Sequence, residues 1–242
     1  MNEGTVATRI GLQGIPSIAE EMMIERDLRL LEYVSASIQD DKSRPHYHVA
    51  HISTAGSAEL IRQAKKKKLP VTCEVTPHHF TLTDEAVQSF DTNTKMSPPL
   101  RTKDDVQALR ECLRDGTIEV IATDHAPHSY DEKQVEFVYA PFGIVGLETA
   151  IGLAVSELVE PKILSLSQLV EKFSLNPRKI LNLPAASVAE GQKANLTLFN
   201  PQQEWVVDVT SFKSKSKNSP FHGRRLKGKA IAIINHGSLY FV

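Results

Sequence analysis

Residues 118–130, with the sequence IEVIATDHAPHSY, decide how the rest of the chain is interpreted. Their first part, 118–123, is a short run rich in β-branched residues, which is typical of a buried strand. Asp124 ends that run, and His125 and His128 follow within four residues. A carboxylate beside two imidazoles can bind a metal ion and can also transfer a proton. The simpler alternative for Asp124 is a salt bridge to a neighbouring side chain, so the surrounding sequence has to decide between the two.

The first 123 residues alternate between the hydrophobic periods of helices and of strands. Neighbouring parallel strands need a crossover connection, which is usually a helix, so this alternation predicts an α/β fold with a parallel sheet. The spacing predicts helices over residues 17–37, 57–68 and 104–114, and strands over residues 46–53, 71–76 and 118–123.

Each of these strands ends beside a residue that can bind a metal ion or support a metal ligand. His51 lies at the end of the first strand, His78 and His79 follow the second, and Asp124 follows the third. In parallel sheets and barrels the ligand-binding face lies at the carboxyl ends of the strands. We therefore expect these side chains to face one cavity.

Two further signals predict where helices begin. Ser17 and Glu20 have the spacing of a capping box, in which the serine caps the helix and the glutamate bonds back to it. Asn176 followed by Pro177 is typical of an N-cap residue and the first helical position. Other helices are expected over residues 147–158 and from Ser165 onward.

From residue 190 the sequence changes to short β segments joined by turns. We place a domain boundary near residue 185. It divides the chain into an α/β part, 1–185, and a small C-terminal β layer, 186–242. The expected β segments cover residues 192–200, 205–209, 229–235 and 239–242.

Composition limits the classes of function. The chain has 28 Lys and Arg against 29 Asp and Glu, a net charge of −1, so nothing indicates a nucleic-acid or membrane surface. No apolar stretch approaches the roughly 18 residues of a membrane-spanning helix. The two cysteines, Cys73 and Cys112, lie far apart in apolar segments, which is typical of reduced thiols. We expect a cytoplasmic protein.

A set of strings runs in order through the chain: HVAHIST (48–54), VTCEVTPHHFTLTDEA (71–86), KMSPPLR (95–101), DGTIEVIATDHAPHS (115–129), APFGIVGLETA (140–150), NPRKIL (176–181), KANLTLF (193–199) and KNSPFHGRRLKG (217–228). Together they resemble the class I bacterial dihydroorotases, which are zinc enzymes of the amidohydrolase superfamily. That family folds as a (β/α)8 barrel of the TIM type, with terminal extensions that combine in a β-sandwich. The resemblance implies that this chain corresponds to barrel strands 6, 7 and 8, the closing helices and the C-terminal half of the sandwich.

The resemblance also implies a metal-dependent reaction. Family members catalyse the reversible cyclisation of N-carbamoyl-L-aspartate to L-dihydroorotate in pyrimidine biosynthesis, with one or two zinc ions. His51 matches the zinc ligand on strand 6, and Asp124 matches both the ligand on strand 8 and the acid/base. His78 and His79 match a family string and are expected to support the metal ligands without binding the metal themselves.

Four other positions are similar to substrate-binding positions of the family. His128 matches the histidine that contacts the substrate, and Phe142 and Gly143 match a backbone stretch against the dihydropyrimidine ring. Ser97 stands where the family usually has asparagine. A hydroxyl offers one donor where an amide offers two, so the resemblance implies an altered substrate contact at this position.

The family's remaining site residues have no counterpart in this chain. They are the H-x-H pair of strand 1, the arginine that follows it, an acidic or lysine ligand and the histidine of strand 5. A catalytic zinc ordinarily has three protein ligands, so we expect this chain alone to be inactive. The first hypothesis is that the sequence comes from a dihydroorotase, as a truncated gene product, a late internal start at Met1 or a crystallised fragment, with a homo-oligomer as a possible assembly. The second is a catalytically dead relative that serves as a scaffold for aspartate transcarbamoylase.

Overall fold

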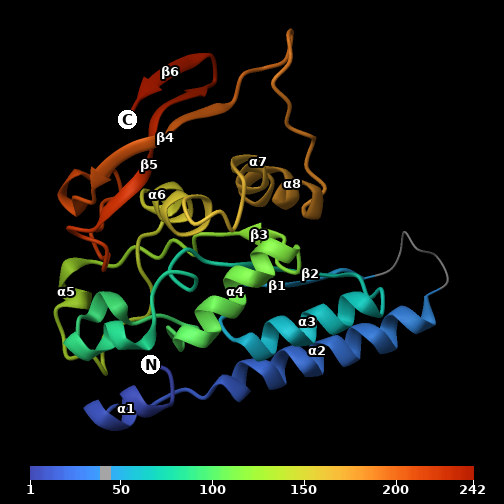
Figure 1. Cartoon of the computed structure of the whole chain (residues 1–242), viewed down its shortest axis with the longest axis vertical. Helices are drawn as coiled ribbons and strands as arrows, with labels where there is room; N and C mark the ends of the chain where they lie inside the picture. Colours follow the sequence, from blue (N-terminus) through green and yellow to red (C-terminus); the bar gives the residue numbers. More distant parts are fainter. Residues whose placement is uncertain (39–44) are drawn as a thin grey trace.

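The computed structural model describes residues 1–38 and 45–242 and has two sheets with helices around and between them (Figure 1). Figure 1 shows α2 (Ser17–Ser37) and α3 (Ala55–Lys66) side by side on one side of the first sheet. The second sheet lies at the opposite end of the molecule, beyond α6 (Ala150–Ala154). The predicted α/β class is confirmed.

The first sheet has three parallel strands in the order β1 (Tyr47–Val49), β2 (Val71–Val75) and β3 (Val120–Ile121). The predicted parallel pairing is therefore confirmed, and it places the carboxyl ends of the three strands at one edge. β1 and β3 are shorter than predicted. Beyond β3, the N–H of Ala122 still donates to the carbonyl of Val75 at 3.1 Å, so the ladder continues by one bond.

Helix α4 (Lys103–Asp115) leads into β3 and extends by one residue beyond each end of the predicted range, 104–114. Thr102 and Asp105 form a capping box at its start, and Gly116 ends it with a left-handed φ of 85°. Its inner face joins the main core, where each fully buried aliphatic side chain contributes about 1.5–3 kcal/mol relative to an exposed one. Side chains at the centre of this core include Ile61, Cys73, Val75, Leu109, Leu113 and Ile118.

The predicted capping box at the start of α2 is wrong. Pro16 holds the N-cap position, with no side-chain hydrogen bond to the first turn. Glu20 instead accepts a hydrogen bond from the N–H of Ser53 at 2.8 Å and one from the hydroxyl of Ser57 at 2.7 Å. The carboxylate of Glu20 therefore makes tertiary hydrogen bonds and does not cap the helix.

The predicted helix start at Asn176 is also wrong, because Asn176 lies within a longer helix. Its amide donates to the carbonyl of Glu119 at 2.9 Å, and Lys172 Nζ donates to the carbonyl of Ile118 at 2.5 Å. Both bonds hold the segment that enters β3. The longer helix consists of α7 (Leu166–Val170), which the predicted Ser165 cap begins, the π-helical η5 (Glu171–Leu175) and α8 (Asn176–Ile180).

The second sheet is antiparallel and packs on α6 and on the π-helical segment η4 (Val155–Val159) that continues it. A Cβ at Gly228 would lie 2.7 Å from that of Val155, so only glycine permits this approach. Two of the predicted β segments form one strand, because an irregularity between Asn200 and Glu204 bends the strand without ending it. The strands are β4 (Leu196–Val206), β5 (Arg225–Asn235) and β6 (Ser238–Phe241).

The remaining elements are short. Within the part of the chain that the structure describes, no helix is both long enough and apolar enough to span a membrane. The short elements are α1 (Thr5–Ile10), α5 (Tyr130–Lys133), and the 3₁₀ turns η2 (Asp84–Ser89), η3 (Thr92–Thr94) and η6 (Val209–Ser211).

Candidate active site

Two sequence-predicted metal ligands have an unusual backbone conformation. His51, after β1, has a φ of 33°, and Asp124, after β3, has a φ of 45°. Left-handed values are uncommon for residues other than glycine and cost of the order of 1–3 kcal/mol. Such conformations cluster at functional sites, and here they turn the chain sharply at the carboxyl edge of the sheet.

His51, His78 and His79 form a group of imidazoles at the ends of β1 and β2. Burial lowers the pKa of His78 well below its usual value, and the neighbouring His79 and His51 lower it further. The rings of His78 and His79 lie with their centroids 4.5 Å apart. Nδ1 of His51 is buried and has no hydrogen-bond partner within the described residues. An imidazole with an unpartnered nitrogen has an atom free to bind a metal ion.

His79 has a supporting position. Its Nε2 donates to the carbonyl of Pro98 at 2.9 Å, so its Nδ1 accepts from the hydroxyl of Thr76 at 2.8 Å. Desolvation by burial lowers the pKa of His79 to about 4. The ring therefore ties the end of β2 to the segment that contains Ser97, which is itself exposed.

The predicted substrate residues after β3 lie together. Nε2 of His128 is 2.8 Å from the carbonyl of Phe142 and donates to it. The N–H of Gly143 donates at 2.9 Å to the carbonyl of Lys95, two residues before Ser97. The loop of His128, the loop of Phe142 and Gly143, and the segment of Ser97 are thus joined by hydrogen bonds.

A buried arginine braces the loop that follows β1. Arg101 is 2% exposed and donates to the hydroxyl of Ser53 at 3.0 Å, to Asn2 Oδ1 at 2.9 Å and to the carbonyl of Ile15 at 2.7 Å. Its guanidinium also lies 3.7 Å from the carboxylate of Glu20. No local pattern marks Arg101 or Glu20 for this role, although Arg101 ends the string KMSPPLR.

Asp124 is exposed and forms no hydrogen bond or ion pair with the described residues, so the salt bridge considered as its alternative is not formed with them. Among residues 1–38 and 45–242, no group of three or more His, Cys, Asp or Glu could hold a metal ion. The buried, unpartnered Nδ1 of His51 and the uncommitted carboxylate of Asp124 fit two positions of a metal site. They do not make a three-ligand site.

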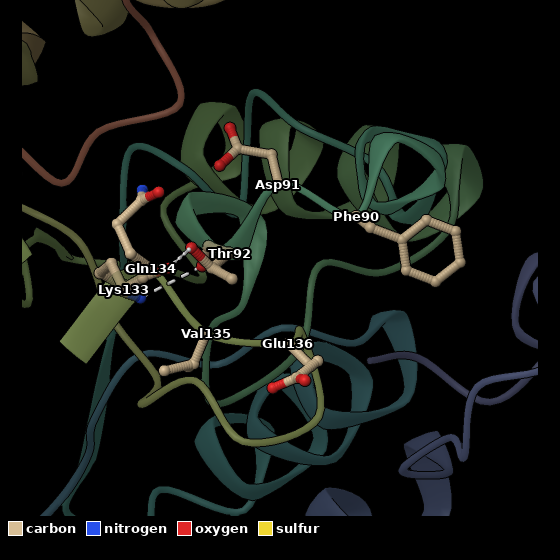
Figure 2. Close-up of a pocket in the computed structure, with 7 residues that line it drawn as sticks. All are labelled: Phe90, Asp91, Thr92, Lys133, Gln134, Val135 and Glu136. Carbon is tan, nitrogen blue, oxygen red and sulfur yellow. Dashed lines mark hydrogen bonds between the residues drawn. The ribbon is translucent and has the colours of Figure 1, made fainter. Parts of the chain in front are cut away.

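A cavity of about 480 Å³ is lined by none of the sequence-predicted site residues (Figure 2). Lys133 Nζ donates to the carbonyls of Thr92 at 3.1 Å and Pro141 at 2.8 Å. Burial, followed by the charge of Lys95, lowers the pKa of Lys133 to about 8. These bonds hold the base of the loop that carries Phe142. The residues around the cavity are Phe90, Asp91, Thr92, Lys133, Gln134, Val135 and Glu136.

This α/β chain, with its histidines and aspartate at the carboxyl edge of a parallel sheet, belongs to the amidohydrolase family, whose model matches residues 38–231. It is 51% identical to the dihydroorotase of Syntrophus aciditrophicus over 241 residues, covering 100% of this chain and 54% of that protein. It is 52% identical to the dihydroorotase of Acetivibrio thermocellus, covering 99% and 54%. The chain thus spans about half the length of these curated relatives, and the similarity to dihydroorotases along the whole chain is confirmed.

About half of each of two solved structures has the same fold as this chain. The L-hydantoinase (dihydropyrimidinase) from Arthrobacter aurescens matches with a TM-score of 0.81 and 27% identity, over 90% of this chain and 48% of that one. The dihydropyrimidinase from Brevibacillus agri matches with a TM-score of 0.83 and 24% identity, over 93% and 49%.

Proposed function

We propose that this chain carries one part of the active site of a dihydroorotase-type cyclic amidohydrolase, which interconverts N-carbamoyl-L-aspartate and L-dihydroorotate in the cytoplasm. The observation that carries the proposal is the gathering of His51, His78 and His79 at one edge of a parallel sheet, in a chain about 50% identical to dihydroorotases. In this proposal β1, β2 and β3 are strands 6, 7 and 8 of a (β/α)8 barrel. Residues 186–242 are half of a β-sandwich.

His51 and Asp124 would hold zinc, with further ligands from outside these 242 residues. When bound, the metal polarises the amide carbonyl and makes water a stronger nucleophile. The carboxylate of Asp124 would take the proton of the attacking water and deliver it to the ring nitrogen that leaves. Its uncommitted position at the strand end supports that role, and His78 and His79 would hold the surrounding backbone in place.

The substrate would lie between the segment of Ser97 and the loops of His128, Phe142 and Gly143. Nε2 of His128 donates to the carbonyl of Phe142, and its Nδ1 lies 3.7 Å from the carboxylate of Glu132. Ser97 would offer a single hydroxyl donor, and we expect Ser97→Asn to maintain or tighten substrate binding.

Zinc binding by the purified chain tests the metal assignment. Isothermal titration should show weak binding that is lost in His51→Ala and in Asp124→Ala, because each variant removes one of the two ligands. His236→Ala, in the exposed turn before β6, is the matched control and should bind zinc as the wild type does. Zinc binding that is unchanged in both ligand variants would refute the assignment.

Complementation tests the reaction. The chain alone should not convert dihydroorotate, and turnover should appear when the N-terminal part of a close relative is supplied by fusion or as a second chain. In the restored enzyme Asp124→Ala should abolish turnover. A restored assembly that binds zinc but shows no turnover would instead support a scaffold role, for example on aspartate transcarbamoylase.

A further inference from the structure

The string KNSPFHGRRLKG, residues 217–228, is part of the resemblance to dihydroorotases, but the proposed function assigns it no role. It contains Asn218, which is 6% exposed. Asn218 lies against the two loops that present the proposed substrate residues, 124–128 and 142–146. A residue that is remote in the sequence therefore joins both loops.

The hydrogen bonds of Asn218 use both of its amide donors. Nδ2 donates to the carbonyl of Ala126 at 3.0 Å and to the carbonyl of Gly143 at 3.2 Å. Oδ1 accepts from the N–H of His128 at 3.2 Å, and the backbone carbonyl of Asn218 accepts from the N–H of Val145 at 3.0 Å. One side chain thus bonds to the backbone of both loops.

The two loops also approach each other closely. His125 and Ile144 form a parallel bridge, and the N–H of Ala126 donates to Ile144 at 2.8 Å. A Cβ at Gly143 would lie 2.5 Å from the Cβ of Ala126. Without the amide donors of Asn218, the carbonyls of Ala126 and Gly143 would each lose a hydrogen bond. Loss of a hydrogen bond by a buried polar group is unfavourable.

We infer that Asn218 is a positioning residue, which clamps the loop of His128 against the loop of Phe142 and Gly143 and so fixes the surface that the substrate meets. The clamp follows from the hydrogen bonds, and only the identity of the bound substrate rests on the proposed function. The C-terminal segment thereby takes part in the geometry of the site without contacting the substrate.

Hydrogen exchange of the purified chain tests the clamp directly. Asn218→Asp keeps the shape of the side chain but replaces the amide donors by a carboxylate oxygen that repels both carbonyls. Exchange in peptides covering 124–131 and 142–147 should become about fivefold faster or more, while residues 47–75 remain unchanged. Lys217→Met is the matched control. Lys217 also donates to two backbone carbonyls, those of Phe212 and Ser214, but both lie in its own segment, so neither loop should change.

A second variant covers the case in which Asn218→Asp does not fold. Gly143→Ala forces the same two loops apart from the opposite side and should accelerate exchange in the same two peptides. Unchanged exchange of both loops in a folded Asn218→Asp protein would overturn the inference. If that variant is unfolded, unchanged exchange in Gly143→Ala would overturn it.

In the complemented enzyme the inference has a kinetic signature. Asn218→Asp should raise KM for dihydroorotate about tenfold or more, with bound zinc unchanged, because a displaced loop misorients the substrate. An unchanged KM would overturn the link from the clamp to the substrate. Failure of complementation itself would count against the proposed function, while the exchange result would still decide the clamp.

Discussion

Acidification should destabilise the folded protein through His79. The pKa of this buried ring is lowered to about 4, whereas an unfolded histidine titrates near 6.5. Between these two values the unfolded state binds a proton that the folded state does not bind, so stability falls as the pH falls. Integration over this window gives a loss of about 2 kcal/mol at a pH of about 4.5 from His79 alone. The buried His78 adds a loss of the same sign.

Urea unfolding of the wild type and of His79→Gln, followed by circular dichroism between pH 7 and about 4.5, measures this contribution. Glutamine retains an amide donor for the carbonyl of Pro98, but it cannot take up a proton. The free energy of unfolding of the wild type should therefore fall by about 2 kcal/mol more than that of the variant over this range. Parallel pH profiles for the two proteins would show that His79 is not held neutral by burial, and the reasoning would fail.

Three other substitutions test separate parts of the structure. Arg101→Met should lower the free energy of unfolding in urea by about 3–5 kcal/mol, because it leaves Glu20 without its buried cation. Arg29→Met removes one partner of an exposed ion pair and should lower it far less, so equal losses would contradict the bracing role. Gly228→Ala should lower the stability measured by thermal unfolding by about 2–4 kcal/mol, because it combines a left-handed φ with a clash against Val155. Gly237→Ala has a similar φ but open space and should lower it by only about 1 kcal/mol, so similar losses would contradict the packing argument. The difference in stability between the wild type and Lys133→Met should grow in favour of the wild type by about 1.4 kcal/mol per pH unit above pH 8, because the folded lysine loses its proton before the unfolded one. A difference that does not change with pH would mean that burial does not destabilise the ammonium.

The sequence predicted the parallel sheet because its signals are local and agree with one another. The helix before β3 shows this best, because its apolar residues recur at helical spacing and Gly116 follows its last turn. The strand after it is short, yet its β-branched run and its place after a glycine stop are sufficient to identify it. The placement of His51 and Asp124 at strand ends followed from the same alternation.

The contacts that fix the site could not be predicted in this way, because they join residues far apart in the sequence. Glu20 has the spacing of a helix cap, yet it bonds to Ser53 and Ser57. Asn218 is an ordinary polar residue in a string that matched a family. Its four bonds become visible only when the folded chain brings it against residues 126–145. Local pattern predicts elements, whereas partners of buried polar groups depend on the tertiary structure.

The hydrogen bonds from Lys172 and Asn176 to the carbonyls of Ile118 and Glu119 hold the start of β3 in place. A strand with only two paired residues, such as β3, has little pairing of its own to prevent a slip by one position. The helix that carries Lys172 and Asn176 prevents this slip by holding the residues that precede β3. Loops of other lengths could therefore be grafted beyond residue 128 while the strand keeps its alignment.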